Sequence, residues 1–393
     1  MPVFDYQPLT RIVAGPGTLA RLGELTWELG IRRVLLVTDP GLEEAGHPQR
    51  ALSILQAAGL YVALFDGVQE NPTTRHVEAG LALAREEGVD GIVAVGGGSS
   101  MDCAKGINFL LTNGGTMRDY WGVGKATRPM LPSVGVPTTA GTGSEAQSFA
   151  LICDPETHLK MACGDKKAAF RVAILDPELT LTQPQRVAAL TGIDALSHAL
   201  ETYVTARRTP LSRLYSREAW RLLAGHFHRV LTEPDDLEAR AAMQWGAHLA
   251  GLAIENSMLG ATHALANPLT AHYGMIHGQA IGLMLPHVIR HNAATMADDY
   301  AELADLAGLS AGDSPQAKAL ALADFVAQAA RLAGVPQSLL ECGVSEGMLT
   351  VLADEAAEQW TGKFNPRPVG YTELLGLYQA AMKGAGSPSR EAK

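Results

Sequence analysis

The stretch GIVAVGGGSSMDCAKGINFLL, residues 91–111, joins a short apolar run, three consecutive glycines and a longer helical pattern. This order predicts a buried strand, a tight turn and a helix. Ser99 and Asp102 are spaced like a capping box at the helix start. Glycines at the positive end of a helix let a diphosphate approach backbone N–H groups. The stretch therefore indicates a nucleotide-binding α/β domain, although a tight strand-to-helix connection without a ligand fits the local pattern equally well.

The residues before this stretch alternate β-rich runs with helical patterns. Strands are predicted within 33–39, 60–68 and 90–95, and helices within 47–59 and 73–88. Continuous apolar strands that alternate with helices are typical of a parallel sheet with right-handed crossovers. Residues 3–25 contain further strand-like runs, which fit either an edge hairpin or pairing with a second subunit.

After about residue 180 the β-rich runs stop and helical patterns follow to the end of the chain. Thr182 is predicted to cap the first of these helices, with Pro184 near its first turn. A chain of 393 residues is too long for one compact core. We therefore expect a Rossmann-like, dinucleotide-binding α/β domain over 1–180 and an all-helical domain over 181–393.

Composition excludes several classes of protein. The net charge is −10 and no Lys/Arg run occurs, which argues against nucleic-acid or anionic-membrane binding and favours a small-molecule partner. No apolar run reaches the length of a membrane span, and the N-terminus does not resemble a secretory signal, so we expect a cytoplasmic protein. The four cysteines lack CxxC spacing and are predicted to be reduced thiols without a catalytic role.

A second polar turn, VPTTAGTGSE at 136–145, follows another apolar strand. Its clustered hydroxyl groups suit hydrogen bonds to ribose and phosphate oxygens. Asp39 ends the strand RVLLVTD, where a carboxylate could accept from an adenosine ribose and would repel a 2′-phosphate, favouring NAD. An Asx-turn before Pro40 explains Asp39 equally well. Asp39 also precedes the glycines, whereas the usual dinucleotide fingerprint has its acidic residue about 20 residues after them.

Two pairs of residues suggest a metal site in the helical half. Asp194 and His198, in TGIDALSHALE, share one helix face because they are four residues apart. His263 and His277 lie in GATHALANPLTAHYGMIHGQAIGLMLPH (260–287), where Pro268 and Gly274 are expected to prevent one straight helix. One carboxylate and three imidazoles suit a divalent transition metal, with Fe²⁺ favoured and Zn²⁺ possible. Other histidines are expected to lie outside this site: His226, His228, His272, His287 and His291.

Six segments, in the same order along the chain, resemble the iron-containing (group III) alcohol dehydrogenase family: GGGSSMDCAK, PTTAGTGSE, DPELTLTQP, TGIDALSHALE, the His263–His277 segment and NPRPVGYTELL. The resemblance implies a dehydroquinate synthase-like architecture, a homodimer formed through the N-terminal strand, and metal-assisted hydride transfer between an alcohol and NAD. It assigns Asp194, His198, His263 and His277 to the metal, with His277 also in the catalytic centre. It assigns these residues to the cofactor: Asp39, Asn71, Gly97, Gly98, Ser99, Asp102, Thr138, Thr139, Thr142 and Lys160.

One departure from the family pattern concerns proton transfer. The family segment commonly reads HxxxHPLG, whereas this chain has HALANPLT, with Asn267 at the position of the second histidine. Asparagine cannot relay a proton as imidazole does. We hypothesise that Asn267 is a catalytic-site residue that orients substrate or cofactor, while protons leave through water, a ribose hydroxyl or His272.

Three other functions stay open from the sequence. The same architecture would suit an NAD-using lyase resembling dehydroquinate synthase, which regenerates its NAD, but such an enzyme needs clustered Lys and Arg near the ligands. A maleylacetate reductase-type enzyme would also need cationic groups, in its case for a dicarboxylate. An inactive, nucleotide-sensing homologue is suggested by Asn267 alone.

Overall fold

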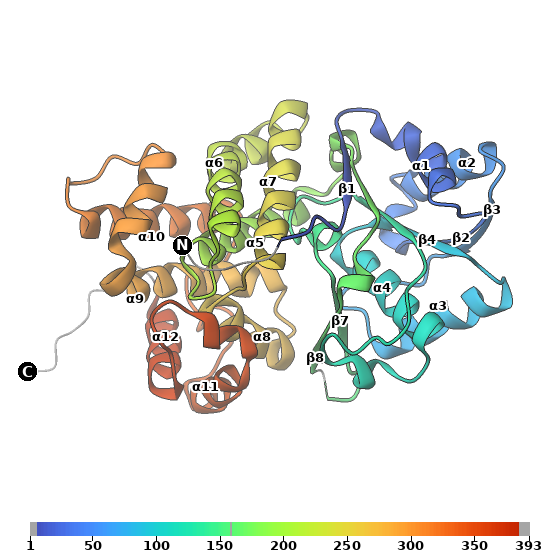
Figure 1. The fold of residues 1–393 in the computed structure, drawn as a ribbon. Coiled ribbons are helices and arrows are strands. Elements are labelled where there is room, and N and C mark those ends of the chain that lie inside the picture. Colours follow the sequence, from blue (N-terminus) through green and yellow to red (C-terminus); the bar gives the residue numbers. More distant parts are fainter. Residues whose placement is uncertain (1–5, 158, 385–393) are drawn as a thin grey trace, which may run out of the picture. The chain divides into compact units, whose positions relative to one another are not determined.

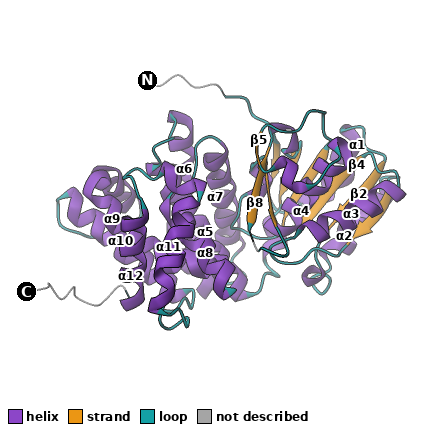
Figure 2. Ribbon diagram, turned by 90° about the horizontal axis from the view of Figure 1, so that it is seen from below, coloured by secondary structure: helices purple, strands orange, loops and turns teal. Residues whose placement is uncertain are grey.

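The computed structural model describes residues 6–157 and 159–384, and its contacts divide the chain into two compact units. Of the described residues, the first unit comprises 6–157, 159–183 and Asp235–Gly251. The second unit comprises Pro184–Pro234 and the described residues of 252–384. All strands of the described residues belong to the first unit, and the described part of the second unit is built of helices, as the separate colours in Figure 2 show.

A six-stranded parallel sheet runs through the first unit (Figure 1). The strand order is β1-β9-β6-β4-β2-β3, and each neighbouring pair is parallel. This confirms the parallel α/β sheet that the alternation of strands and helices predicts. The strands are β1 (Arg11–Ala14), β2 (Arg33–Val37), β3 (Tyr61–Phe65), β4 (Gly91–Gly96), β6 (Ser133–Pro137) and β9 (Val172–Leu175).

The central strands β2, β4, β6 and β9 are buried on both faces along almost their whole length, which explains why they are mostly apolar. In β2, Val34 and Leu36 belong to a core cluster that includes residues of α1 and α2, whereas Leu35 and Val37 belong to a cluster that includes residues of α3 and α4. Successive side chains of a strand point to opposite faces, so a sheet covered on both sides needs an unbroken apolar run. The helices are α1 (Leu22–Glu28), α2 (His47–Ala57), α3 (Thr74–Glu86) and α4 (Gly98–Asn113).

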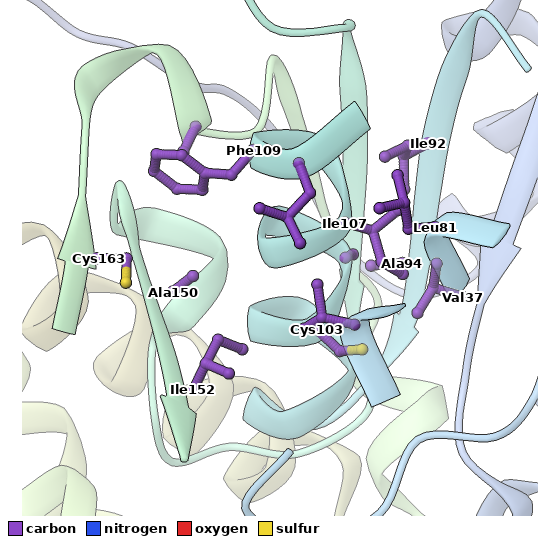
Figure 3. Packing of buried hydrophobic residues seen from close by; sticks show 14 of the residues in the cluster. Val37, Leu81, Ile92, Ala94, Cys103, Ile107, Phe109, Ala150, Ile152 and Cys163 are labelled. Carbon is purple, nitrogen blue, oxygen red and sulfur yellow. The ribbon is translucent and has the colours of Figure 1, made fainter. Parts of the chain in front are cut away.

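Helix α4 packs on two sheets. A second, three-stranded sheet has the order β5-β8-β7 and comprises β5 (Gly122–Val123), β7 (Phe149–Cys153) and β8 (Lys160–Gly164). Figure 3 shows Cys103 and Ile107 of α4 between Ile92 of β4 and Ile152 of β7. Because it is covered on both sides, α4 is buried without interruption from Ser100 to Leu110.

Strand β1 pairs within the large sheet with a strand that is far from it in the sequence. It pairs in parallel with β9, from Arg11 opposite Val172 to Ala14 opposite Leu175, and lies at the edge of the large sheet. No antiparallel partner of β1 occurs among the described residues of the opening segment, which are 6–25. Residues 1–5 of the proposed dimer-forming segment lie outside the described residues.

Helix α7 (Leu237–Glu255) belongs for most of its length to the first unit, although it follows helices of the second. The close approach of two glycines explains this. A Cβ on Gly251 would lie 2.5 Å from the carbonyl oxygen of Gly143, and one on Gly143 would lie 2.7 Å from the carbonyl oxygen of Ala247. Residues 235–251 thus pack on the 136–145 turn, a long-range contact that helical periodicity cannot reveal.

The second unit contains seven further α-helices in its described residues. Its first helix, α5, has Pro184 at its N-cap position, and Thr182 does not cap it. The Thr182 hydroxyl instead hydrogen-bonds the Nε2 atom of His47 at 2.7 Å, so that prediction is wrong. The helices are α5 (Gln185–Val204), α6 (Pro210–Thr232), α8 (Ala261–Tyr273), α9 (His277–Leu306), α10 (Pro315–Leu332), α11 (Leu349–Glu358) and α12 (Tyr371–Lys383).

The helical segment between His263 and His277 is interrupted at Gly274 only, and not also at Pro268. Pro268 lies inside α8, so it does not end that helix. Gly274 ends it, because its φ of +59° and left-handed conformation cost glycine little. Helix α9 then begins at His277 and kinks at Met296, whose φ is −120°. No helix in the described part of the chain meets the length and hydropathy needed to cross a membrane.

Candidate functional site

Helix α5 supplies two of the expected metal ligands. Asp194 and His198 lie one turn apart on its buried face, as their spacing predicts. The Nε2 atom of His198 is 3.3 Å from Oδ1 of Asp194. The ring therefore turns its Nε2 edge toward the carboxylate.

Helices α8 and α9 bring the other two imidazoles to the same carboxylate oxygen. His263 lies in the first turn of α8, and His277 is the first residue of α9. Their Nε2 atoms are 3.5 Å and 3.7 Å from Oδ1 of Asp194. Donor atoms of Asp194, His263 and His277 all lie within 4.8 Å of one another. The structure thus brings together all four residues that the sequence pattern selects.

The chemistry of this cluster fits a divalent cation. Oδ1 of Asp194 and Nε2 of His263 are buried and make no hydrogen bond. A buried polar atom without a partner costs roughly 1–3 kcal/mol, and a shared metal ion would satisfy both. One carboxylate oxygen and three imidazole nitrogens match the ligand preferences of iron and zinc.

The electrostatics of the cluster also favour positive charge. Burial opposes the charged form of His263, but the carboxylates of Asp194 and Glu201 outweigh it and raise the pKa of His263 to about 9. Burial alone would raise the pKa of Asp194, yet His198, His263 and His277 lower it below its usual range. The carboxylates of Asp194 and Glu201 therefore favour positive charge at this cluster, and a bound cation would supply it.

Glu201 is a residue at this site that sequence reasoning missed. It lies on α5 seven residues after Asp194 and three after His198, and its side chain is 5% exposed. Its Oε2 atom accepts a hydrogen bond from Nδ1 of His263 at 2.7 Å. The i, i+4, i+7 spacing places all three α5 residues on one helix face, and that pattern could have identified Glu201.

Asn267 follows His263 by one turn of α8. Its side-chain Nδ2 donates to Oε1 of Gln359 at 2.9 Å. His272, the proposed alternative proton route, lies on the same helix and is paired with Glu355 at 2.8 Å. Neither His272 nor the other four histidines expected to lie elsewhere belongs to the ligand cluster found among the described residues.

The two polar turns of the first unit lie side by side because their strands are neighbours. Strands β4 and β6 pair in parallel with Gly96 opposite Pro137, and the N–H of Thr138 donates to the carbonyl of Gly96 at 3.0 Å. A Cβ on Gly98 would lie 2.7 Å from Cγ2 of Thr142, so only glycine allows this approach. The Thr138 hydroxyl is buried without a hydrogen-bond partner, which fits an oxygen-rich ligand at this position.

The start of α4 differs from the predicted capping box. Helix α4 begins at Gly98 with Gly97 at the N-cap, and no side chain caps it. Asp102 instead accepts a hydrogen bond at 2.6 Å from the hydroxyl of Ser144, which belongs to the polar turn 136–145. Its carboxylate also lies 3.7 Å from Nζ of the buried Lys105. Burial raises the pKa of Asp102, whereas Lys105 and Ser144 oppose that rise.

The three remaining residues expected to bind the cofactor lie in two places: Asp39 beside the glycine turn, and Asn71 and Lys160 near the β7–β8 hairpin. Asp39 accepts a hydrogen bond from the Ser100 hydroxyl at 2.9 Å, so it lies beside the glycine turn, and burial raises its pKa. Asn71 has a φ of +53°, and its neighbour Pro72 accepts a hydrogen bond from the N–H of Cys153. Lys160 pairs with Cys153 in the β7–β8 ladder. Asn71 and Lys160 therefore lie near the end of that hairpin.

Two family models cover most of the chain. Residues 9–177 match the iron-containing alcohol dehydrogenase model, and residues 188–382 match the C-terminal model of the Fe-containing alcohol dehydrogenase family. The chain is 36% identical over 386 residues to a 1,3-propanediol dehydrogenase of Klebsiella pneumoniae, covering 96% of this chain and 99% of that protein.

Other relatives agree. An NAD-dependent methanol dehydrogenase of Bacillus methanolicus is 33% identical over 375 residues, which is 94% of this chain and 97% of the relative. A solved structure of a 1,3-propanediol oxidoreductase superposes with a TM-score of 0.94 at 35% identity, covering 97% of this chain and 100% of the other. The chain therefore belongs to the iron-containing alcohol dehydrogenase family of oxidoreductases.

Proposed function

We propose that this protein interconverts a small alcohol and its aldehyde or ketone by hydride transfer to and from NAD(H), with a divalent metal bound to Asp194, His198, His263 and His277. The observation that carries the proposal is the convergence of three Nε2 atoms on Oδ1 of Asp194, within 3.3–3.7 Å. The names of the two relatives described above, a propanediol and a methanol dehydrogenase, support small alcohols as substrates.

The metal, when bound, would supply a Lewis acid that polarises the substrate oxygen and lowers the pKa of an alcohol. Asp194, His198 and His263 are almost fully buried and would hold the ion away from water. The His277 side chain is 24% exposed, so its side of the cluster is the most open to a substrate. Four protein ligands are more than the three that catalytic zinc usually takes, which leads us to propose Fe²⁺, with Zn²⁺ as the alternative.

The first unit would bind NAD through its two polar turns. The first backbone N–H groups of α4, including those of Gly98 and Ser99, have no partners within the helix and could bind a phosphate. Gly97 precedes them at the N-cap position. Thr138, Thr139 and Thr142 would hydrogen-bond ribose and phosphate oxygens, and Asp39 would select NAD over NADP by charge. We extend the proposal to Asp102, Asn71 and Lys160, and to residues 1–180 as the dinucleotide-binding part.

Within the second unit, Asn267 and His277 are the proposed catalytic-site residues. The Asn267 amide donates to Gln359, which leaves its oxygen available to accept from a substrate hydroxyl or a carboxamide. We propose that Asn267 orients a ligand in this way and that the proton leaves by another route. Residues 181–393, apart from the segment that packs with the first unit, would form the metal-binding part.

Assembly and compartment are further parts of the proposal. Strand β1 lies at the edge of the large sheet, and an edge strand offers unpaired backbone groups to a second subunit, which supports a homodimer. All four cysteines are free, which supports a reducing compartment such as the cytoplasm. Burial raises the pKa of Cys103 and Cys163 to about 12, which makes them poor nucleophiles.

The test combines metal analysis with turnover. Protein purified without oxygen should contain about one iron per chain and reduce NAD with 1,3-propanediol or another small alcohol. His263→Ala should lose both the metal and the turnover while it still binds NAD, because the two sets of residues belong to different units. His228→Ala, at an exposed position on α6, is the matched control and should keep both. Wild-type turnover in metal-stripped His263→Ala would overturn the proposal.

A further inference from the structure

The Glu201 side chain accepts three hydrogen bonds, all of them buried. Its Oε1 atom accepts from the N–H of Thr262 at 2.7 Å. Its Oε2 atom accepts from the N–H of Gly260 at 3.1 Å and from Nδ1 of His263 at 2.7 Å. One carboxylate on α5 therefore binds the first turn of α8 and the metal-ligand ring that this turn carries.

We propose that Glu201 is a positioning residue that holds His263 with its proton on Nδ1 and its Nε2 lone pair directed at the metal. The inference rests on the metal site proposed above. An ionised carboxylate can only accept hydrogen bonds, so the ring nitrogen that faces it must carry a proton. The opposite nitrogen then stays free to bind a cation, and it is this atom that lies 3.5 Å from Oδ1 of Asp194.

The same carboxylate also limits the movement of the ring. The N–H groups of Gly260 and Thr262 lie at the start of α8, where a helix has no partners of its own for them. By accepting from both, Glu201 joins the backbone that carries His263 to the helix that carries Asp194 and His198. A Cβ on Gly260 would lie 3.1 Å from Oε1 of Glu201, so glycine allows the carboxylate to approach this closely.

Glu201→Gln tests the proposal with little change in shape. A carboxamide has one acceptor oxygen, but three N–H groups point at the native carboxylate. If the amide nitrogen took the place of Oε1, it would face the N–H of Thr262 at 2.7 Å, and two donors would oppose each other. If it took the place of Oε2, it would face the N–H of Gly260 at the longer distance of 3.1 Å. We expect the second orientation, in which the amide nitrogen donates to Nδ1 of His263 and the ring proton must move to Nε2.

The primary measurement is the affinity of the metal-free protein for Zn²⁺, determined by competition with a chelator and without any activity assay. We expect Glu201→Gln to bind Zn²⁺ roughly 10–100-fold more weakly than wild type. Glu355→Gln is the matched control, because Glu355 forms a Glu–His pair of similar length, 2.8 Å, with His272 outside the metal cluster. The control should bind Zn²⁺ within twofold of wild type.

The outcomes separate this inference from the proposed function. If wild type does not bind Zn²⁺ or Fe²⁺, the proposed metal site and this inference are both wrong. If wild type binds tightly and Glu201→Gln binds equally well but unfolds at a lower temperature, Glu201 only caps α8 and the inference alone is wrong.

A second measurement does not depend on the folding of the variant. In Zn²⁺-loaded wild type labelled with ¹⁵N-histidine, NMR should show His263 protonated at Nδ1 and bound to metal at Nε2. The opposite assignment would overturn the inference.

Discussion

Replacing Lys105 by methionine would test whether a buried charge network holds the two polar turns of the first unit together. The Lys105 side chain is 1% exposed, and its Nζ donates to the carbonyl and hydroxyl of Ser144 and to the carbonyl of Phe149, at 2.7–2.8 Å. It is also 3.7 Å from the buried carboxylate of Asp102. Methionine fills a similar volume but removes the charge and every donor.

The expected cost follows from the charge that stays behind. Breaking a buried ion pair by removing one partner costs roughly 3–5 kcal/mol, because the other charge is left uncompensated. For a unit of this size we expect Tm to fall by roughly 6 to 20 °C. Lys105→Met combined with Asp102→Asn should recover part of that loss, because the uncompensated carboxylate is then absent.

Chemical and thermal denaturation of the three proteins would measure these differences. Arg118→Met is the control, because the Arg118–Asp154 pair has an arginine side chain that is 67% exposed and should contribute less than about 1 kcal/mol. If Lys105→Met destabilised the protein no more than Arg118→Met does, the buried network would carry no special weight and the argument would fail.

Two other substitutions concern titratable groups. Asn267→His should add an ionisation at about pH 6.5 to the pH profile of kcat, because a titratable imidazole replaces an amide at the proposed catalytic site. Asn267→Gln should keep the wild-type profile. Identical profiles for the wild type and both variants would contradict the assignment of this position to the catalytic site. Burial and Arg290 lower the pKa of His287 from 6.5 to about 4, so the unfolded chain binds this proton more tightly than the folded one. The contribution of neutral His287 to the free energy of unfolding is complete above about pH 6.5, and it decreases by about 3 kcal/mol as the pH falls toward 4. Urea denaturation should measure the free energy of unfolding of the wild type and of His287→Gln, and the difference between them should decrease as the pH falls from 6.5 to 4. A constant difference would show that burial does not lower the pKa of His287.

The local pattern of residues was sufficient for the sheet and for one ligand pair. Strands such as β2 are buried on both faces, so their apolar runs and the helices between them predicted a parallel sheet. Asp194 and His198 required no tertiary information to be placed together, because four residues make about one helical turn. The family resemblance rested on motifs of this local kind.

Several features depended on contacts between distant segments. Helix α7 packs with the first unit because Gly251 meets Gly143, although its own periodicity matches the helices of the second unit. Asp102 was expected to cap α4, but the parallel pairing of β4 with β6 brings Ser144 to it instead. Pro268 was expected to break α8, yet the helix continues to Tyr273.

The amino-acid sequence by itself determined the two kinds of domain, the glycine turn and the residues able to bind a metal, because these follow from periodicity, side-chain chemistry and local spacing. The tertiary structure alone decided that His263 and His277 meet Oδ1 of Asp194, and that Glu201 accepts from Nδ1 of His263. Spacing along one helix sets which side chains share a face, whereas the meeting point of three helices is set by how their surfaces pack.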